Sequence, residues 1–105
     1  MLERTPGFAG RVFTDAELAY ANEARDPTQR LAARFAAKEA VMKVLGVGIG
    51  EVRLRDIEVV RADSGAPSLR LHGSAAELAA GRSVRRWLLS MTHTDLVASA
   101  VAVAE

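Results

Sequence analysis

The chain has 105 residues, half of them apolar and about a quarter charged, with a formal net charge of +1. This size suits a single domain over residues 1–105, and the near-neutral charge gives no global reason to expect binding to nucleic acid or a membrane surface. The absence of cysteine excludes disulfides, thiolate metal sites and a cysteine nucleophile, and it suits a reducing cytoplasm. The longest apolar run, residues 96–104, is far shorter than the roughly 20 residues of a membrane span.

Two helices are predicted in the first half of the chain. Thr14 and Glu17 have the spacing of a capping box and open a helix that ends near Glu23. A second helix follows over residues 27–45, with a proline in its first turn. Gly46 comes directly after it and has the position of a C-cap.

The second half of the chain has the pattern of two β-hairpins and a short helix. The expected strands cover residues 52–61, 68–72, 84–92 and 96–104, and the short helix covers residues 74–80. Two main helices and two hairpins imply an α+β domain in which the helices pack on an antiparallel sheet.

The second helix carries the strongest physical signal. Between residues 31 and 45 only Arg34, Lys38, Glu39 and Lys43 are charged. A helix that is apolar almost all round is buried on most sides, so these few charges must be paired or must face a polar ligand. Lys38 falls within the apolar stripe, whereas Glu39 and Lys43 share the adjacent flank at positions i and i+4.

Two interpretations of these charges stay open on spacing alone. In the first, Glu39 and Lys43 form a surface salt bridge, and Lys38 extends its ammonium to solvent along its aliphatic stem. In the second, the carboxylate binds a metal and the cations bind phosphate. The glycine-rich residues 46–50 are not a Walker loop, because they follow a helix and so meet its carbonyl end.

Two turns contain further candidate residues. His93 lies between two threonines, the second of them Thr94, in the expected turn of the last hairpin. It is either a solvated side chain or, together with the hydroxyls, a donor to phosphate. Gly65 and Pro67 are ordinary residues of a hairpin turn on their own evidence.

Taken together, these motifs resemble the acyl-carrier-protein synthases, a family of 4'-phosphopantetheinyl transferases. The resemblance extends over residues 10–105 in the family's order and spacing. Its motifs are residues 11–17, residues 34–40 with Lys43, Gly46 and Gly48, residues 56–59, residues 65–67 and residues 90–94.

The resemblance implies an enzyme that transfers 4'-phosphopantetheine from coenzyme A to a serine hydroxyl of an acyl carrier protein. It implies dependence on Mg²⁺, release of 3',5'-ADP, a place in fatty-acid or polyketide synthesis, and trimers with active sites between subunits. Glu39 is then the Mg²⁺ ligand and, with Lys43, a catalytic residue. The residues expected to bind the coenzyme are Arg34, Lys38, Lys43, Gly46, Gly65, Pro67, His93 and Thr94.

One departure from the family pattern concerns the beginning of the chain. The family starts with a strand whose aspartate is a second metal ligand, and residues 1–8 do not match it. We therefore expect an N-terminally truncated domain or a non-standard metal site. The alternatives are a weakly active or inactive member that binds coenzyme A, and a small α+β interaction domain without catalysis, in which Glu39 and Lys43 form a structural pair.

Overall fold

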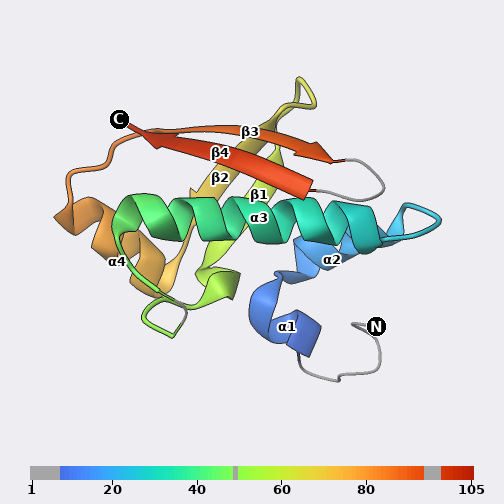
Figure 1. Ribbon diagram of the computed structural model, residues 1–105, viewed down its shortest axis with the longest axis horizontal. Coiled ribbons are helices and arrows are strands. Elements are labelled where there is room, and N and C mark those ends of the chain that lie inside the picture. Colours follow the sequence, from blue (N-terminus) through green and yellow to red (C-terminus); the bar gives the residue numbers. More distant parts are fainter. Residues whose placement is uncertain (1–7, 49, 94–97) are drawn as a thin grey trace.

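A long helix, α3, lies at the centre of the computed structural model, which describes residues 8–48, 50–93 and 98–105 (Figure 1). The helices are α1 (Phe8–Val12), α2 (Asp15–Asn22), α3 (Thr28–Leu45), η2 (Leu54–Asp56, a 3₁₀ turn) and α4 (Gly73–Gly81). The strands are β1 (Ile57–Arg61), β2 (Pro67–Leu71), β3 (Trp87–His93) and β4 (Ala98–Ala104). No helix of the described ranges is long and apolar enough to cross a membrane.

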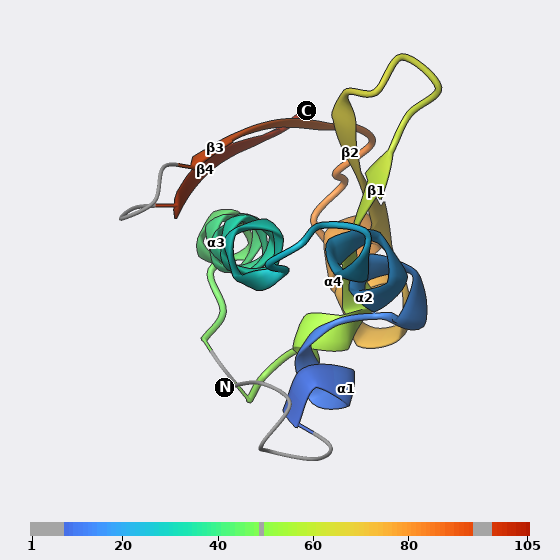
Figure 2. The same ribbon diagram turned by 90° about the vertical axis from the view of Figure 1, so that its right-hand side faces the viewer.

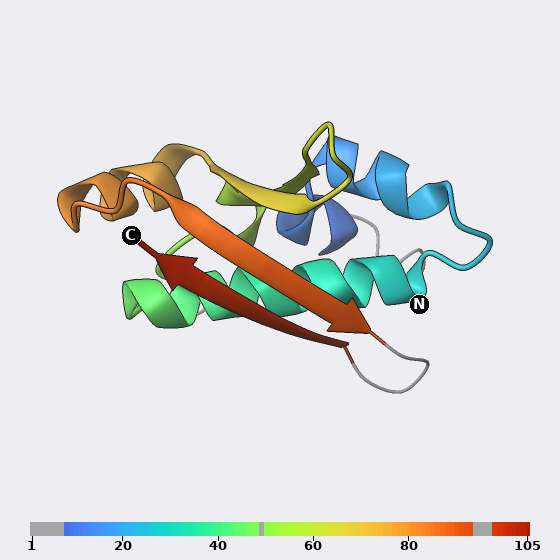
Figure 3. The same ribbon diagram turned by 90° about the horizontal axis from the view of Figure 1, so that it is seen from above.

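The predicted α+β class is confirmed, but the strands form two separate antiparallel hairpins instead of one sheet. β1 pairs with β2, and β3 pairs with β4. The two hairpins lie on different sides of α3 (Figure 2), and β3 and β4 run across this helix when seen from above (Figure 3). β2 and β3 come into contact, but no hydrogen-bonded ladder joins them among the described residues.

Local sequence signals set most of the element boundaries. The capping box is confirmed: the Glu17 amide donates to Thr14 Oγ1 over 3.2 Å, and the Thr14 amide donates to Glu17 Oε1 over 2.8 Å. Gly46 closes α3 in the left-handed conformation, with φ of 74°. The first strand begins at Ile57 and not at residue 52, because a 3₁₀ turn precedes it.

The short helix α1 was not predicted. It has only five residues and no acidic residue in its first turn, so its sequence carries little helix signal of its own. Arg55 holds it from another part of the chain, since one guanidinium nitrogen donates to the carbonyls of Gly10 and Phe13 over 2.9 and 2.8 Å. The missed element therefore depends on a tertiary contact.

The interior has two clusters of buried apolar side chains, and α3 contributes to both. The larger cluster consists of Val41, Met42, Leu45, Val52, Ile57, Ala75 and Ala79. The smaller one consists of Val12, Phe13, Ala21 and Leu31. The predicted apolar stripe of α3 is thus buried at Leu31, Met42 and Leu45.

The start of α4 is fixed by the side chain of Asp56. Asp56 Oδ2 accepts hydrogen bonds from the amide and the hydroxyl of Ser74 over 3.1 and 2.9 Å. Gly73 has φ of +45°, and a Cβ at this position would lie 2.8 Å from the same oxygen. Only glycine fits this turn without displacing the carboxylate.

Glu58 on β1 connects the two halves of the chain through polar contacts. Its Oε2 accepts from the Thr14 hydroxyl over 2.7 Å, and its Oε1 lies 2.9 Å from His72 Nε2. Burial by itself would raise the pKa of Glu58, but the hydrogen bonds from Thr14 and His72 and the charges of His72 and Arg70 outweigh it. They hold the pKa below its ordinary value of 4.5.

This lowered pKa predicts a pH-dependent contribution to stability. A carboxylate with a lower pKa in the folded than in the unfolded state stabilises the fold above its unfolded pKa, and this stabilisation is lost as the pH falls through the folded pKa. We expect Glu58→Gln to be less stable than the wild type in urea at about pH 7, and the difference to shrink in acid below about pH 4. Glu77→Gln, at an exposed position of α4, is the control, and an equal loss in that variant would contradict the assignment.

Candidate functional site

Helix α3 places its four charged side chains in different surroundings. Arg34 and Lys38 are buried, Glu39 is partly buried and Lys43 is exposed. The buried side chains follow the 3.6-residue period that packs one face of the helix against the core. The helix therefore presents both internal and accessible charges along one axis.

Lys38 is fully buried, so the interpretation in which its ammonium reaches solvent is wrong. Its Nζ donates to Glu17 Oε1 over 2.8 Å, to the Leu54 carbonyl over 3.0 Å and also to the Ile57 carbonyl. An ammonium has three N–H donors, and all of them are used inside the protein. The structure therefore does not support the expected contact of Lys38 with phosphate. Burial lowers the pKa of Lys38, while the charge and hydrogen bond of Glu17 oppose that effect.

Glu39 and Lys43 do not form the alternative surface salt bridge. Within the described ranges, neither side chain has a hydrogen bond or an ion pair. A partly buried carboxylate and an exposed ammonium thus remain available to a ligand, one helical turn apart. This arrangement suits a polyanion that carries a cation.

The donor set at Glu39 fits Mg²⁺ as a single protein ligand. A hard carboxylate oxygen suits this ion, which keeps several waters and commonly binds one or two carboxylates together with substrate phosphates. The described part of the chain contains no group of three His, Cys, Asp or Glu side chains that could hold a metal by themselves. Water and a bound phosphate compound are the further ligands that Mg²⁺ commonly accepts beside one carboxylate.

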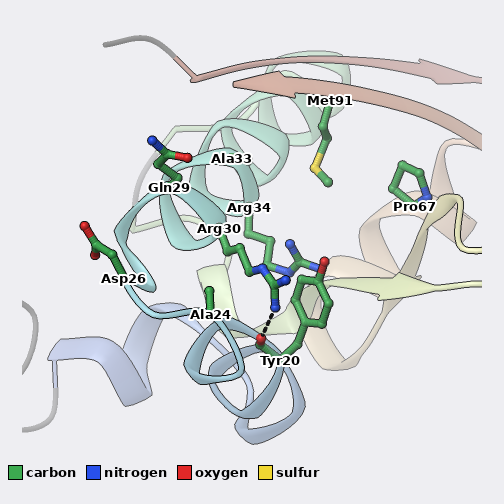
Figure 4. A pocket seen from close by; sticks show the side chains of 9 residues that line it. All are labelled: Tyr20, Ala24, Asp26, Gln29, Arg30, Ala33, Arg34, Pro67 and Met91. Carbon is green, nitrogen blue, oxygen red and sulfur yellow. Dashed lines mark hydrogen bonds between the residues drawn. The ribbon is translucent and has the colours of Figure 1, made fainter. Parts of the chain in front are cut away.

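A pocket of about 390 Å³ lies beside the N-terminal half of α3, with Tyr20, Arg30, Arg34, Pro67 and Met91 among its lining residues (Figure 4). The guanidinium carbons of Arg30 and Arg34 each lie 4.2 Å from the centroid of the Tyr20 ring. The pocket thus combines an aromatic face with two cations. It also brings together two predicted site residues, Arg34 and Pro67, from distant parts of the sequence.

A third guanidinium, that of Arg61, lies 5.0 Å from the centroid of the same ring. The predicted site residue Gly65 is next to it, because a Cβ at Gly65 would lie 3.4 Å from Arg61 Nη2. Of these three cations, Arg30 is partly compensated by Glu23, whose Oε1 lies 4.0 Å from its Nη1, whereas Arg34 and Arg61 have no ion pair among the described residues and leave a local positive charge. Such a local field favours an anion.

Arg34 has an unmet hydrogen-bonding capacity. Its side chain is buried, its Nε has no hydrogen-bond partner, and no carboxylate among the described residues pairs with it. Burial lowers the pKa of Arg34, although the charges of Tyr20 and Glu17 partly offset this effect. Buried polar groups are normally hydrogen-bonded, so an unsatisfied guanidinium beside a pocket points to an anionic ligand.

The remaining predicted residues lie elsewhere. Gly46 caps α3 three residues after Lys43, and His93 is the last residue of β3. Thr94 and the side chain of His93 lie outside the described residues. Along the helix axis, Glu39 is about 7.5 Å from Arg34 and about 6 Å from Lys43 at 1.5 Å per residue.

The sequence-based prediction missed Tyr20, Arg30 and Arg61. Arg30 could have been found, since it precedes Arg34 by four residues and therefore shares its helix face. Tyr20 and Arg61 belong to α2 and β1, and nothing in their local sequence indicates that they meet Arg34.

Comparisons with known proteins identify the family of the chain. The family model of the 4'-phosphopantetheinyl transferase superfamily matches residues 1–101. The holo-(acyl-carrier-protein) synthase of Streptomyces avermitilis is 51% identical over 104 residues, which cover 99% of this chain and 84% of that protein.

Two solved structures extend the similarity to the fold. The holo-(acyl-carrier-protein) synthase of Neisseria meningitidis has a TM-score of 0.85 and 34% identity, covering 99% of this chain and 84% of that one. The Helicobacter pylori enzyme in complex with coenzyme A has a TM-score of 0.82 and 27% identity, covering 98% of this chain and 85% of that one. The resemblance found in the sequence motifs is confirmed: the chain belongs to the 4'-phosphopantetheinyl transferase superfamily, as an enzyme of the holo-(acyl-carrier-protein) synthase type.

Proposed function

We propose that the chain transfers 4'-phosphopantetheine from coenzyme A to a serine hydroxyl of an acyl carrier protein and releases 3',5'-ADP in a Mg²⁺-dependent reaction. The observation that carries the proposal is the set of charges on α3. Arg34, Glu39 and Lys43 follow one another along one helix, and none of them has an ion pair within the described residues. At 100° per residue Glu39 and Lys43 lie about 40° apart on one flank, where a carboxylate and an ammonium suit a divalent cation bound to phosphate, whereas Arg34 lies about 180° from Lys43 and faces the Tyr20 pocket.

In the reaction, the serine oxygen forms a bond to the phosphorus that carries the pantetheine arm. The bond from that phosphorus to the bridging oxygen of the pyrophosphate breaks, 3',5'-ADP leaves with the electron pair of this bond on its phosphate oxygen, and the proton of the serine hydroxyl is released to solvent water. Glu39 would hold Mg²⁺, which when bound neutralises charge on phosphate oxygens. Lys43 stabilises the charge that moves onto the leaving group, because a fixed cation there requires no reorganisation during the reaction.

The arginine pocket is the proposed site for the nucleotide end of coenzyme A. Arg34 is buried without a hydrogen-bond partner for its Nε, and Arg30 lies beside it over the Tyr20 ring. The phosphate on the ribose would supply the missing acceptor for Arg34. The other predicted contacts of the coenzyme stay predictions; they are Gly46, Gly65, Pro67, His93 and Thr94. We propose further that the reaction belongs to fatty-acid or polyketide synthesis in the cytoplasm.

The outer face of the β3–β4 hairpin supports the proposed homotrimer. Leu88, Val101 and Val103 are 49%, 62% and 46% exposed, and Leu88 lies opposite Val103 in the register. Adjacent large apolar side chains on a sheet surface mark a protein interface. We propose that two further copies of the chain cover this face and complete active sites between subunits.

The alternative of an interaction domain without catalysis depended on a structural pair between Glu39 and Lys43. That pair does not occur among the described residues, and the relatives are enzymes by name. The other alternative is a weakly active member. It would be supported if the wild-type chain bound coenzyme A in the titrations below but transferred phosphopantetheine only slowly.

We predict that Glu39→Gln lowers the transfer rate by about 100-fold or more at saturating coenzyme A, because the change keeps the volume and removes the charge that holds Mg²⁺. The measurement follows transfer to a carrier protein over a range of Mg²⁺ concentrations, with circular dichroism as a check of folding. Glu77→Gln is the control. A wild-type rate in Glu39→Gln would show that this residue is not the metal ligand.

We predict that Arg34→Met and Lys43→Ala weaken coenzyme A binding in different ways. Each charged hydrogen bond that is lost should reduce affinity by about tenfold or more. Because 3'-dephospho-coenzyme A lacks the ribose phosphate, Arg34→Met should change its affinity little, whereas Lys43→Ala should weaken both ligands. Calorimetric titrations measure these affinities, with Arg53→Met at an exposed position as the control. Equal losses for both ligands in Arg34→Met would place the ribose phosphate elsewhere.

We predict that the wild-type chain sediments as a trimer, and that Leu88→Glu combined with Val103→Glu shifts it to monomers, because burying like charges in an apolar interface is strongly unfavourable. Ser68→Glu, at an exposed position of β2, is the control and should leave the trimer intact. Analytical ultracentrifugation distinguishes the species. A monomeric wild type, or a trimeric double variant, would refute this interface.

A further inference from the structure

The buried ion pair between Glu17 and Lys38 lies where three elements meet. Glu17 Oε1 accepts from Lys38 Nζ and from the Thr14 amide, each over 2.8 Å, and Oε2 accepts from the Val59 amide over 2.9 Å. Both side chains are fully enclosed. A single carboxylate thus connects the N-terminal end of α2, the middle of α3 and the strand β1, which converge in this region (Figure 2).

Stability alone is a weak explanation for such a pair. The cost of removing two charges from water often exceeds their mutual attraction, so a well-packed apolar pair of similar volume is frequently as stable or more stable. The pair differs from an apolar contact because hydrogen bonds are directional: they fix the angles between the groups that they join, and apolar packing does not. Its distinctive effect is therefore the rotation and axial position of α3 relative to α2 and β1.

That rotation determines where Glu39 lies. Glu39 follows Lys38 directly and is displaced from it by 100° around the helix and about 1.5 Å along it. Within the described ranges no hydrogen bond or ion pair orients the Glu39 side chain. Its position is therefore set by the backbone of α3 and by packing. On that backbone Lys38 has the nearest directional contacts, whereas Ala37 and Val41 are held by apolar burial, which restrains the rotation of the helix less sharply.

We propose that Glu17 is a positioning residue for the transfer reaction: through Lys38 it fixes the rotation of α3 that places the Glu39 carboxylate. The inference rests on the proposed function of Glu39. Displacing a catalytic group by about 1 Å can lower a rate by about 100-fold, and losing an outer-shell contact typically lowers metal affinity or activity by about 10- to 100-fold. Glu17 touches neither substrate nor metal in this scheme and acts only through its neighbour.

Three variants separate positioning from stability. Glu17→Gln and Lys38→Met each leave one buried charge without a partner and should be less stable than the wild type. The double variant Glu17→Gln/Lys38→Met removes both charges at nearly constant volume, and its melting temperature should return toward that of the wild type. Its geometric constraint does not return, since Met cannot donate the hydrogen bonds of the ammonium.

In the double variant we expect kcat per folded molecule to be at least about tenfold lower and Mg²⁺ to bind the coenzyme A complex about tenfold more weakly in calorimetric titrations. The KM for the carrier protein should stay unchanged. If the double variant regains its stability and also has wild-type kcat and wild-type Mg²⁺ affinity, Glu17 has a structural role only and the inference is overturned.

A further variant keeps the test decisive if the double variant does not fold. Glu17→Asp preserves the charge but shortens the side chain. Lys38 should stay paired, and kcat corrected for the folded fraction should fall. An unchanged kcat would overturn the inference.

Ser74→Ala is the control, because it weakens the start of α4 without touching α3. Its folded fraction should therefore have wild-type kcat. If Glu39→Gln is fully active, the proposed role of Glu39 fails; if only the Glu17 variants are fully active, the positioning role alone fails.

Discussion

The contact between Glu17 and Lys38 is the constraint on which the arrangement of the other elements depends. A lysine in the middle of an apolar helix face can be buried only if all its donors find oxygen atoms. Glu17 and two carbonyls of residues 54–57 provide them, and α2, η2 and β1 must therefore approach α3 at one point. Removing a single partner of such a pair costs about 3–5 kcal/mol, which is a large share of the stability of a small domain.

The charged side chains of α3 that have no partner inside the protein explain how this helix can also bind a ligand. Lys38 is fully paired, whereas Arg34, Glu39 and Lys43 have no ion-pair partners in the described part of the chain. A protein that pairs one buried cation completely and leaves another buried guanidinium unsatisfied has a clear place for an anionic ligand. One of the four charges on α3 therefore has a structural role, and the other three are available to a substrate.

The Tyr20 pocket shows how a nearly neutral chain can bind a highly charged molecule. Three guanidinium groups gather around one ring, and the ring partly compensates their mutual repulsion through its negative face. An incoming phosphate would relieve this repulsion and supply an acceptor to Arg34, the buried member of the three, whose Nε has no hydrogen-bond partner. The binding energy is thereby concentrated in one place, and the remaining surface needs no excess of positive charge.

The sequence by itself determined the elements that depend on local chemistry. The capping box of Thr14 and Glu17, the long helix that follows, its glycine cap and the alternation in the hairpins all arise from interactions between residues close in the chain. The signature on α3 was also local, and it indicated the family together with the motifs of residues 11–17, 56–59, 65–67 and 90–94. The tertiary structure alone decided that Lys38 pairs with Glu17 and that Tyr20 and Arg61 meet Arg34. The physical reason is that periodicity shows which face of a helix is buried, whereas the partner buried against it comes from a distant segment whose position only the complete fold defines.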